Sequence, residues 1–444
     1  MPSKKTTHVR YVIVLMLFIA STFSYGDRVV LSIAADALSH DLHLDAIHLG
    51  YLFSGFGWAY ALAQLPAGGL LDRYGSKSVY GISIFCWSLC AVLAGFTGYL
   101  PAVAAFYTLF GLRLLDGLAQ APVFPGNGRI VAAWFPTAER GRASALFNAA
   151  QYFSLVFFAP IMGWIVHLWR WKQCFWFAGA VGLIFGGFWF RVIHSVQSHP
   201  RISQSEIDLI EQGGGLASLD ATGRPHTNTL TWSAVRWLLS KRMLVGIYLG
   251  QYCITTLTWF FLTWFPVYLS RARHIPIVKV GFLAALPALC GFIGGILGGV
   301  VSDEFLRVGR SLSFARKVPI VAGMLLAMSM VACNYVSTRT AVIAIMSLAF
   351  FGKGFGALGW TVVSDTSPKT LVGINGGLFN LIGNLAGVTT PIVIGYIVGR
   401  TGSFRGALVF VAATALMAIV AYLPIVGEIK RIEAPPALVP GAPA

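Results

Sequence analysis

Long apolar stretches, separated by short polar segments, follow one another along almost the whole chain of 444 residues. A helix needs about 20 largely apolar residues to cross the hydrocarbon core of a bilayer. Twelve stretches are about this long, so we predict an all-α polytopic membrane protein with twelve transmembrane helices. The predicted spans cover residues 11–35, 47–71, 78–97, 101–122, 142–166, 173–193, 243–269, 277–301, 318–336, 340–364, 373–398 and 404–426.

One long polar interval, residues 194–242, divides these spans into two groups of six. It contains a Gly213-Gly214-Gly215 run and a turn signal at 222–225, which are typical of linkers. One short amphipathic helix is predicted within it, near residues 205–212. We therefore predict two pseudo-symmetric six-helix bundles. The predicted units are an N-terminal bundle (1–193), a cytosolic linker (194–242), a C-terminal bundle (243–431) and a cytosolic tail (432–444).

The composition excludes an ordinary soluble domain. Hydrophobic residues make up 57% of the chain and charged residues only 11%, whereas soluble domains average about 25% charged residues. The net charge is +16, and the Lys and Arg residues are concentrated in the loops on the side of the N-terminus. The positive-inside rule therefore predicts that both termini are cytosolic. This distribution explains the basicity without a nucleic-acid partner.

No residue pattern indicates a cofactor, a metal site or a cleaved leader. The six cysteines lie within apolar segments without metal-ligand spacing, and the nine histidines form no HExxH or similar motif. We therefore expect neither a metal nor a cofactor. The first apolar stretch resumes after Asp27-Arg28, and no small-residue cleavage site precedes it, so we expect this segment to be retained.

A glycine-containing charged segment follows the second span and recurs after the eighth. The first copy is Gly69-Leu70-Leu71-Asp72-Arg73-Tyr74-Gly75-Ser76-Lys77, and the second begins Gly299-Val300-Val301-Ser302-Asp303. Recurrence six spans later favours two related halves with a cavity at their interface over an ordinary solvated loop. We predict a gating loop that contains Gly69, Asp72, Arg73, Gly75 and Lys77.

Charged residues lie inside the predicted spans, where each costs roughly 3 kcal/mol unless it faces protein or water. Asp27 and Arg28 lie in the first span. Arg113, Asp116 and Gln120 lie in the fourth span at spacings of three, four and seven residues, which place them on one helix face. These residues form a candidate functional site.

Several sequence blocks resemble the anion:cation symporter family within the major facilitator superfamily, with most similarity to bacterial glucarate/galactarate permeases. The blocks are YGDR (25–28), FSGFGWAY (53–60), APVFP (121–125), IVAAWFP (130–136), WFFLTWFP (259–266) and FFGKGFGALGW (350–360). Similar blocks occur in nearly every span from residue 8 to residue 431. The resemblance implies a proton-coupled carrier of organic anions, not an enzyme, in the bacterial cytoplasmic (inner) membrane.

The resemblance also implies roles for the charged residues. Arg28 and Arg113 are expected to bind a substrate carboxylate, to which a guanidinium donates two parallel hydrogen bonds. Alternatively, Arg113 and Asp116 form only a structural clamp. Asp27 is the expected proton-coupling acid, because burial favours its neutral form and a neighbouring cation its ionised form. The alternative is a permanent Asp27–Arg28 or Asp27–Arg113 pair that only fixes helix packing.

The fourth span departs from the family pattern at Gln120. The family ordinarily has a glutamate there, which is thought to be a coupling protonation site in related symporters, and glutamine cannot bind and release a proton. Asp116, one turn earlier, stands where the similar permeases have an apolar residue. We therefore predict that the titratable group has moved by one turn to Asp116. If Asp116 only neutralises Arg113, coupling depends on Asp27 alone or is weakened.

The tenth span contains Lys353, with Trp360 two turns away on the same helix face. A third cation, in the half opposite the two arginines, is suited to a second carboxylate, which glucarate and galactarate have and aldonates lack. Alternatively, Lys353 extends to the membrane interface or pairs with Asp365.

Polar and aromatic residues within the spans are candidate partners for sugar hydroxyls. By resemblance these are Tyr25, Tyr60, Gln151, Gln251, Trp360, Asn380 and Asn384. For Asn384 we favour helix packing, since a polar group inside a span must face either a cavity or another helix. Trp259 and Trp264 are predicted to be packing or interfacial anchors.

These features predict a secondary transporter that imports a sugar diacid of the glucarate or galactarate type with protons, by alternating access. Its expected partners are the sugar-acid anion, protons and the lipid bilayer, and we expect a monomer. The alternative is a carrier or exchanger of another organic anion, such as a hexuronate or aldonate. An intramembrane enzyme would need a nucleophile–base or metal-ligand cluster, and a transporter-like sensor a large soluble output domain; neither is evident in the sequence.

Overall fold

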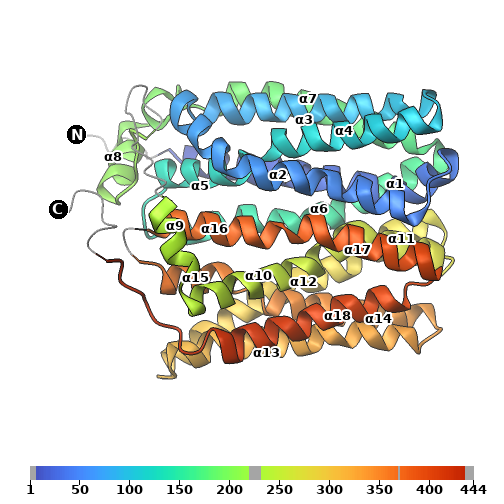
Figure 1. Ribbon diagram of the computed structural model, residues 1–444. Helices are drawn as coiled ribbons and strands as arrows, with labels where there is room; N and C mark the ends of the chain where they lie inside the picture. The colour runs from blue at the N-terminus through green and yellow to red at the C-terminus, as the bar shows by residue number, and fades with distance from the viewer. Residues whose placement is uncertain (1–6, 220–231, 369–370, 436–444) are drawn as a thin grey trace.

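The computed structural model describes residues 7–219, 232–368 and 371–435, and within these ranges every regular element is a helix (Figure 1). The predicted turn at 222–225 and the predicted tail beyond residue 435 lie outside them. The helices before the polar interval are α1 (Val9–Asp41), α2 (Ala46–Tyr74), α3 (Ser76–Phe96), α4 (Ala102–Gln120), α5 (Val123–Trp134), α6 (Arg140–Leu168) and α7 (Trp171–Val192). Those that follow are α8 (Gln204–Gln212), α9 (Trp232–Leu239), α10 (Arg242–Trp259), α11 (Phe265–Val267), α12 (Ile277–Arg307), α13 (Leu312–Met328), α14 (Arg339–Phe355), α15 (Gly359–Thr366), α16 (Val372–Asn384), α17 (Ala386–Thr401) and α18 (Arg405–Val420).

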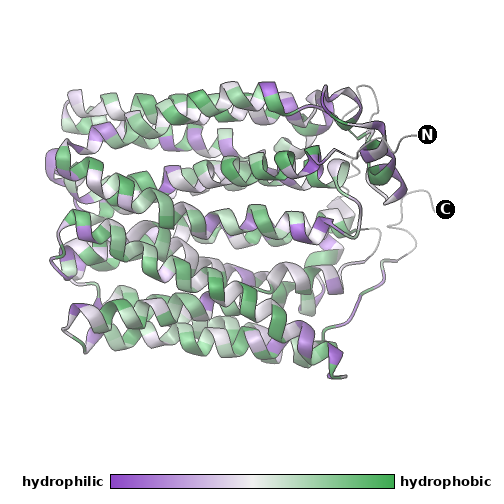
Figure 2. Cartoon of the chain, turned by 180° about the vertical axis from the view of Figure 1, so that it is seen from behind, coloured by the Kyte–Doolittle hydropathy of each residue, from purple (hydrophilic) through white to green (hydrophobic). Residues whose placement is uncertain are grey.

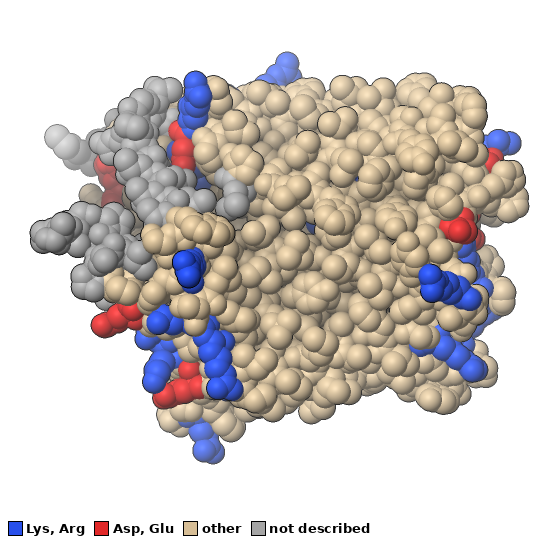
Figure 3. Space-filling view, in the orientation of Figure 1, with Lys and Arg blue, Asp and Glu red and all other residues tan. Residues whose placement is uncertain are grey.

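The helices run side by side and are long enough to cross a bilayer. Eleven segments of the described residues, 21 to 33 residues long, are apolar enough to do so. Helix α2, with 29 residues, lies between the first two of them in the chain and completes a set of twelve. Hydrophobic residues cover most of the helix lengths (Figure 2), and charged side chains gather toward the two ends (Figure 3). The prediction of an all-α polytopic fold with twelve transmembrane helices is confirmed.

Several spans consist of two helical pieces and extend beyond the predicted ends. In the fourth span, α4 ends at Gln120 and α5 begins after Pro122, which has no backbone N–H to donate. In the tenth span, α14 ends at Phe355 and α15 begins at Gly359. Helix α1 continues to Asp41, because hydropathy marks only the apolar middle of a helix and the backbone remains helical through its polar end.

The segment predicted as a gating loop is mostly helical. Helix α2 continues through residues 69–73 to Tyr74, only Gly75 interrupts the chain, and Lys77 lies in the first turn of α3. Gly75 has a φ of 76°, a left-handed conformation that glycine adopts easily. The prediction of a loop is therefore wrong for residues 69–74, because the charged residues Asp72 and Arg73 still belong to α2, which ends at Tyr74.

Two helix pairs join the first half of the chain to the second: α2 packs against α17, and α6 packs against α12. Glycines allow the helices of each pair to pack closely. If Gly50 carried a Cβ atom, that atom would lie 2.7 Å from a backbone oxygen of α17, and a Cβ atom on Gly163 would lie 3.0 Å from a backbone oxygen of α12. Toward the opposite helix ends, a Cβ at Gly68 or Gly141 would meet no described atom within 4 Å. The halves therefore make these close contacts near the loop between α1 and α2.

A buried carboxylate attaches α8 to the beginning of α1. Glu206 is 0% exposed and accepts hydrogen bonds from the backbone N–H groups of Val9 and Arg10 at 3.0 and 3.2 Å. It also accepts from the Arg10 guanidinium at 3.1 Å and from the Thr7 hydroxyl at 2.7 Å. A negative charge at this end compensates the helix dipole. Helix α8 confirms the short helix predicted near residues 205–212.

Replacing Glu206 with Gln should lower the free energy of unfolding by about 2 kcal/mol, because hydrogen bonds to a charged group each contribute about 1.5–3 kcal/mol. The change is measured by chemical unfolding of the purified protein in detergent. Glu211→Gln is the matched control, since Glu211 lies in the same helix with an exposed side chain. Equal effects of the two substitutions would contradict this role of Glu206.

Candidate functional site

Arg113 lies between two carboxylates that come from different helices. Its Nη1 donates to Oδ2 of Asp27 at 2.7 Å and to Oδ2 of Asp116 at 2.8 Å. Asp116 lies three residues along the same helix, a spacing that brings side chains together, whereas Asp27 reaches Arg113 from α1. All three side chains are buried. The structure thus contains both the Arg113–Asp116 pair and the Asp27–Arg113 pair.

Gln120 connects Asp116 to Arg28. Its Nε2 donates to Oδ1 of Asp116 at 2.7 Å, and its Oε1 accepts from the Ser24 hydroxyl at 2.6 Å and from Nη2 of Arg28 at 3.4 Å. The side chains at positions 116 and 120 are therefore within hydrogen-bond distance of each other. They are four residues apart, a spacing that makes side chains neighbours on one face of a helix.

Arg28 is a buried cation that lies among aromatic rings. Its guanidinium carbon is 4.3 Å from the ring centroid of Phe56, 4.6 Å from Tyr25, 5.5 Å from Tyr60 and 5.7 Å from Trp259. Such contacts stabilise a cation by about 0.5–2 kcal/mol each, less than a paired carboxylate in a dry site. Arg28 is 5% exposed, and within the described residues it forms no ion pair and its Nε has no hydrogen-bond partner. Its charge is therefore not neutralised by a direct ion pair within the described residues.

The formal charges of the cluster balance when every group is ionised, since Asp27 and Asp116 oppose Arg28 and Arg113. One added proton on either acid leaves one positive charge in excess. In a buried site of low dielectric constant, that excess charge attracts an anion much more strongly than it would in water. The arrangement can therefore make anion binding depend on proton binding.

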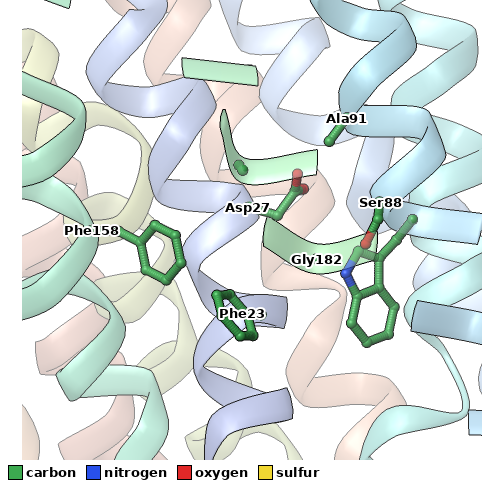
Figure 4. Close-up of a pocket in the computed structure, with 8 residues that line it drawn as sticks. Phe23, Asp27, Ser88, Ala91, Phe158 and Gly182 are labelled. Atoms are coloured by element: carbon green, nitrogen blue, oxygen red, sulfur yellow. The ribbon is translucent and has the colours of Figure 1, made fainter. Parts of the chain in front are cut away.

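A small pocket within the first half of the chain reaches Asp27 (Figure 4). Besides the aspartate, its lining is mostly apolar, with one hydroxyl from Ser88 on α3. The lining residues are Phe23, Asp27, Trp87, Ser88, Ala91, Phe158, Ala178 and Gly182. The pocket has a size on the order of one water molecule, so it is too small for an organic anion such as a sugar acid.

Lys353 on α14 is a further buried cation without a carboxylate partner in the described part of the chain. It is 3% exposed, its Nζ donates to the Tyr152 hydroxyl at 3.3 Å, and it lies 5.4 Å from the ring centroid of Phe350. Asp365 instead accepts from Nε of Arg316 at 2.8 Å. The alternatives of a Lys353–Asp365 pair and of extension to the interface are therefore wrong. The break after α14 places Asp365 on a separate helix.

The predicted glutamines are engaged within their own helices. Nε2 of Gln151 donates to the backbone oxygen of Asn148 at 3.3 Å, and Nε2 of Gln251 donates to the Thr255 hydroxyl at 3.2 Å. Both side chains are half-buried. Neither has a hydrogen bond to the charged cluster among the described residues.

The predicted residues of α15 and α16 form a second group. Asn380 donates to the Gln64 side chain of α2 and so links the two halves. Asn384 donates to the backbone oxygen of Asn380 at 2.8 Å and to its side-chain oxygen at 3.0 Å. Trp360 is 48% exposed and packs on Phe379 with ring centroids 4.9 Å apart. Tyr25 and Tyr60 contact Arg28 directly, whereas Asn380 bonds to Gln64, one helical turn after Tyr60 on α2.

Several contacting residues were not anticipated from the sequence. Ser24 lies one helical turn before Arg28, and Phe56 one turn before Tyr60, so helix periodicity around the predicted residues would have indicated both. No local signal marks Tyr152 as the partner of Lys353. Trp259, predicted as an anchor, also contacts Arg28.

The predicted gating segment joins α2 to neighbouring elements. Asp72 forms an ion pair with Arg129 of α5, and Arg129 also donates to the backbone oxygen of Leu219 at 2.9 Å. The guanidinium of Arg73 lies over the ring of Tyr74 at 5.2 Å. This end of α2 is therefore connected to α5 and to the segment after α8.

Twelve membrane-crossing helices that enclose buried cations without a direct carboxylate partner among the described residues are typical of a membrane transport protein. In agreement with this class, residues 17–391 match the model of the Major Facilitator Superfamily, and the chain belongs to this superfamily of transporters, which are not enzymes. The described residues contain no group of three or more His, Cys, Asp or Glu side chains placed to hold a metal ion.

Curated relatives and solved structures resemble the chain over almost its whole length. The probable galactarate/D-glucarate transporter GudP of Bacillus subtilis (strain 168) is 56% identical over 97% of this chain and 95% of the relative. The protein of the same name from Escherichia coli (strain K12) is 53% identical over 98% of this chain and 97% of the relative. The crystal structure of a D-xylose-proton symporter superposes with a TM-score of 0.72 at 14% identity, over 95% of this chain and 98% of that one, and so shares the fold.

Proposed function

We propose that this transporter imports a sugar diacid of the glucarate or galactarate type together with protons. The observation that carries the proposal is that Arg28 and Lys353 are buried cations on helices of different halves, and neither is paired with a carboxylate among the described residues. A diacid has one carboxylate for each cation. The names of the curated relatives, probable galactarate/D-glucarate transporters, support the same substrate class.

In this proposal, Arg28 and Arg113 attract one carboxylate and Lys353 binds the other. Aromatic and amide side chains then contact the sugar hydroxyls. These are Tyr25, Tyr60, Gln151, Gln251, Trp360, Asn380 and Asn384. The amides that now hydrogen-bond to protein groups would exchange these partners for hydroxyls, which is nearly neutral in energy because each bond lost is replaced.

Proton coupling follows from the charge balance. With Asp27 and Asp116 both ionised, the cluster has no excess charge to attract an anion. Protonation of one acid creates that charge, so proton binding and substrate binding strengthen each other by the same factor. We infer that Asp27 binds the coupling proton and that Asp116 takes over part of the role that a glutamate at position 120 has in related symporters.

The transport cycle is alternating access between two six-helix bundles, 1–193 and 243–431, joined by the cytosolic linker 194–242. Both termini are cytosolic in this proposal, and the protein works as a monomer in the bacterial inner membrane. The loop between α1 and α2 then faces the outside, and the close packing of the halves near that loop is consistent with an outward gate that is closed. The segment with Gly69, Asp72, Arg73, Gly75 and Lys77 gates the cytosolic side.

Asp116→Asn tests the relocated acid. Uptake of labelled galactarate driven by a pH gradient should fall about tenfold or more, within the usual range of coupling between two sites. Adding Gln120→Glu to this variant should restore most of the uptake, because the two side chains lie within hydrogen-bond distance. Uptake that is unchanged in Asp116→Asn, or that Gln120→Glu does not restore, would contradict the relocation.

The substrate class is tested by uptake of labelled glucarate into proteoliposomes, with unlabelled galactarate, galactonate and glucuronate as competitors. Galactarate should compete best, because it alone among the three presents a carboxylate at each end. Better competition by galactonate or glucuronate would favour a carrier of aldonates or hexuronates instead. No uptake of any sugar acid would overturn the proposal.

A further inference from the structure

Tyr152 and Lys353 face each other across the contact between the two halves. Tyr152 lies on α6 and Lys353 on α14, and both are buried. The tyrosine ring also packs against Phe350 of α14 with centroids 5.8 Å apart, and a Cβ at Gly291 of α12 would lie 2.9 Å from it. Tyr152 is therefore held in one position at the interface of α6 with α12 and α14.

A tyrosine contacts each of these two buried cations: Tyr25 lies beside Arg28, and Tyr152 lies beside Lys353. The ring of Tyr25 lies 4.6 Å from the Arg28 guanidinium. The hydroxyl of Tyr152 accepts from Lys353.

The hydrogen bond between Lys353 and Tyr152 leaves donors unused. An ammonium has three N–H donors, and a phenol that accepts one hydrogen bond still has its own O–H to donate. Among the described residues, Nζ of Lys353 has Tyr152 as its one hydrogen-bond partner, and the Tyr152 hydroxyl donates to no group. Unused donors in a buried site are costly. A carboxylate placed beside the pair would accept from both.

We propose that Tyr152 is a specificity-determining residue that binds, together with Lys353, the distal carboxylate of a diacid. This inference rests on the proposed function and adds a selection step to it. A diacid places its second carboxylate between a hydroxyl of the first half and an ammonium of the second, and so ties the halves together. An aldonate has a neutral hydroxymethyl group at that end and gains much less from the same two donors.

The test compares a diacid and a mono-acid of the same sugar in a Tyr152→Phe variant. The KM for labelled galactarate should rise about tenfold or more, the loss expected for one hydrogen bond to a charged group. The inhibition constant of unlabelled galactonate should change less than about threefold, because it makes no such bond. Tyr422→Phe is the matched control, since Tyr422 is a fully buried tyrosine whose hydroxyl has no partner in the described structure.

A double-mutant cycle keeps the test decisive if galactonate binds too weakly to measure. Tyr152→Phe and Lys353→Met should together raise the KM for galactarate by clearly less than the product of their separate effects, because both act on one carboxylate. Multiplicative effects, or equal losses for galactarate and galactonate, would overturn the role of Tyr152 while leaving diacid transport intact. Wild-type protein that does not transport galactarate would overturn the proposed function itself.

Discussion

Asp27→Asn should reduce pH-gradient-driven accumulation of galactarate by about 100-fold, near the upper end of typical coupling between two sites. Asparagine keeps the size of the side chain and can still accept the hydrogen bond that Arg113 donates at 2.7 Å. It cannot bind or release a proton. Arg28 and Lys353 remain, so exchange of labelled for unlabelled galactarate without a pH gradient should keep most of its rate. Both rates are measured in the same proteoliposomes.

Asp41→Asn is the matched control for this prediction. Asp41 lies at the exposed end of the same helix, and its side chain accepts a hydrogen bond from Trp171 at 2.9 Å, which asparagine can also accept. This control should keep both accumulation and exchange. Accumulation that survives in Asp27→Asn would contradict the role of Asp27, and loss of exchange together with accumulation would indicate a structural role instead.

Arg28→Gln should raise the KM for galactarate by about 100-fold, which corresponds to losing about 2.7 kcal/mol of carboxylate binding. Arg28 is the better test of anion binding than Arg113, because Arg113 is paired with Asp27 and Asp116 and its removal would leave two buried carboxylates unpaired. Arg28 has no such partner among the described residues. The KM is measured from initial rates of uptake of labelled galactarate.

Arg28→Lys separates the charge of this residue from its shape. Lysine keeps the positive charge but lacks the planar pair of donors that matches a carboxylate, so its KM should lie between those of the wild type and Arg28→Gln. Equal KM values for the two variants would mean that the charge does not contribute. An unchanged KM in Arg28→Gln would remove Arg28 from the substrate site.

The helical fold was predictable because the bilayer requires about 20 apolar residues per crossing, a signal that is long and local. The ends of helices were not, because polar residues at a helix end stay helical until a residue such as Gly75 allows the backbone to turn. The break after α14 was equally invisible to hydropathy. It separates Asp365 from Lys353 and made the predicted alternative pair wrong.

The sequence predicted which charged residues belong to the site, but it left open which of them contact each other. Arg113 and Asp116 are three residues apart on one helix, so their contact follows from helix geometry. Asp27 and Arg28 are adjacent and so point in different directions, which allows Asp27 to contact α4 while Arg28 contacts aromatic rings. Tyr152 comes from the opposite half to Lys353, and no sequence spacing relates the two.

The most direct test of the account is uptake of labelled galactarate by the purified wild-type protein in proteoliposomes, with and without an inwardly directed proton gradient. The account predicts accumulation above the equilibrium level with the gradient, and only equilibration when a protonophore removes it. Accumulation that does not depend on the gradient, or no galactarate uptake in either condition, would contradict proton-coupled transport of a sugar diacid.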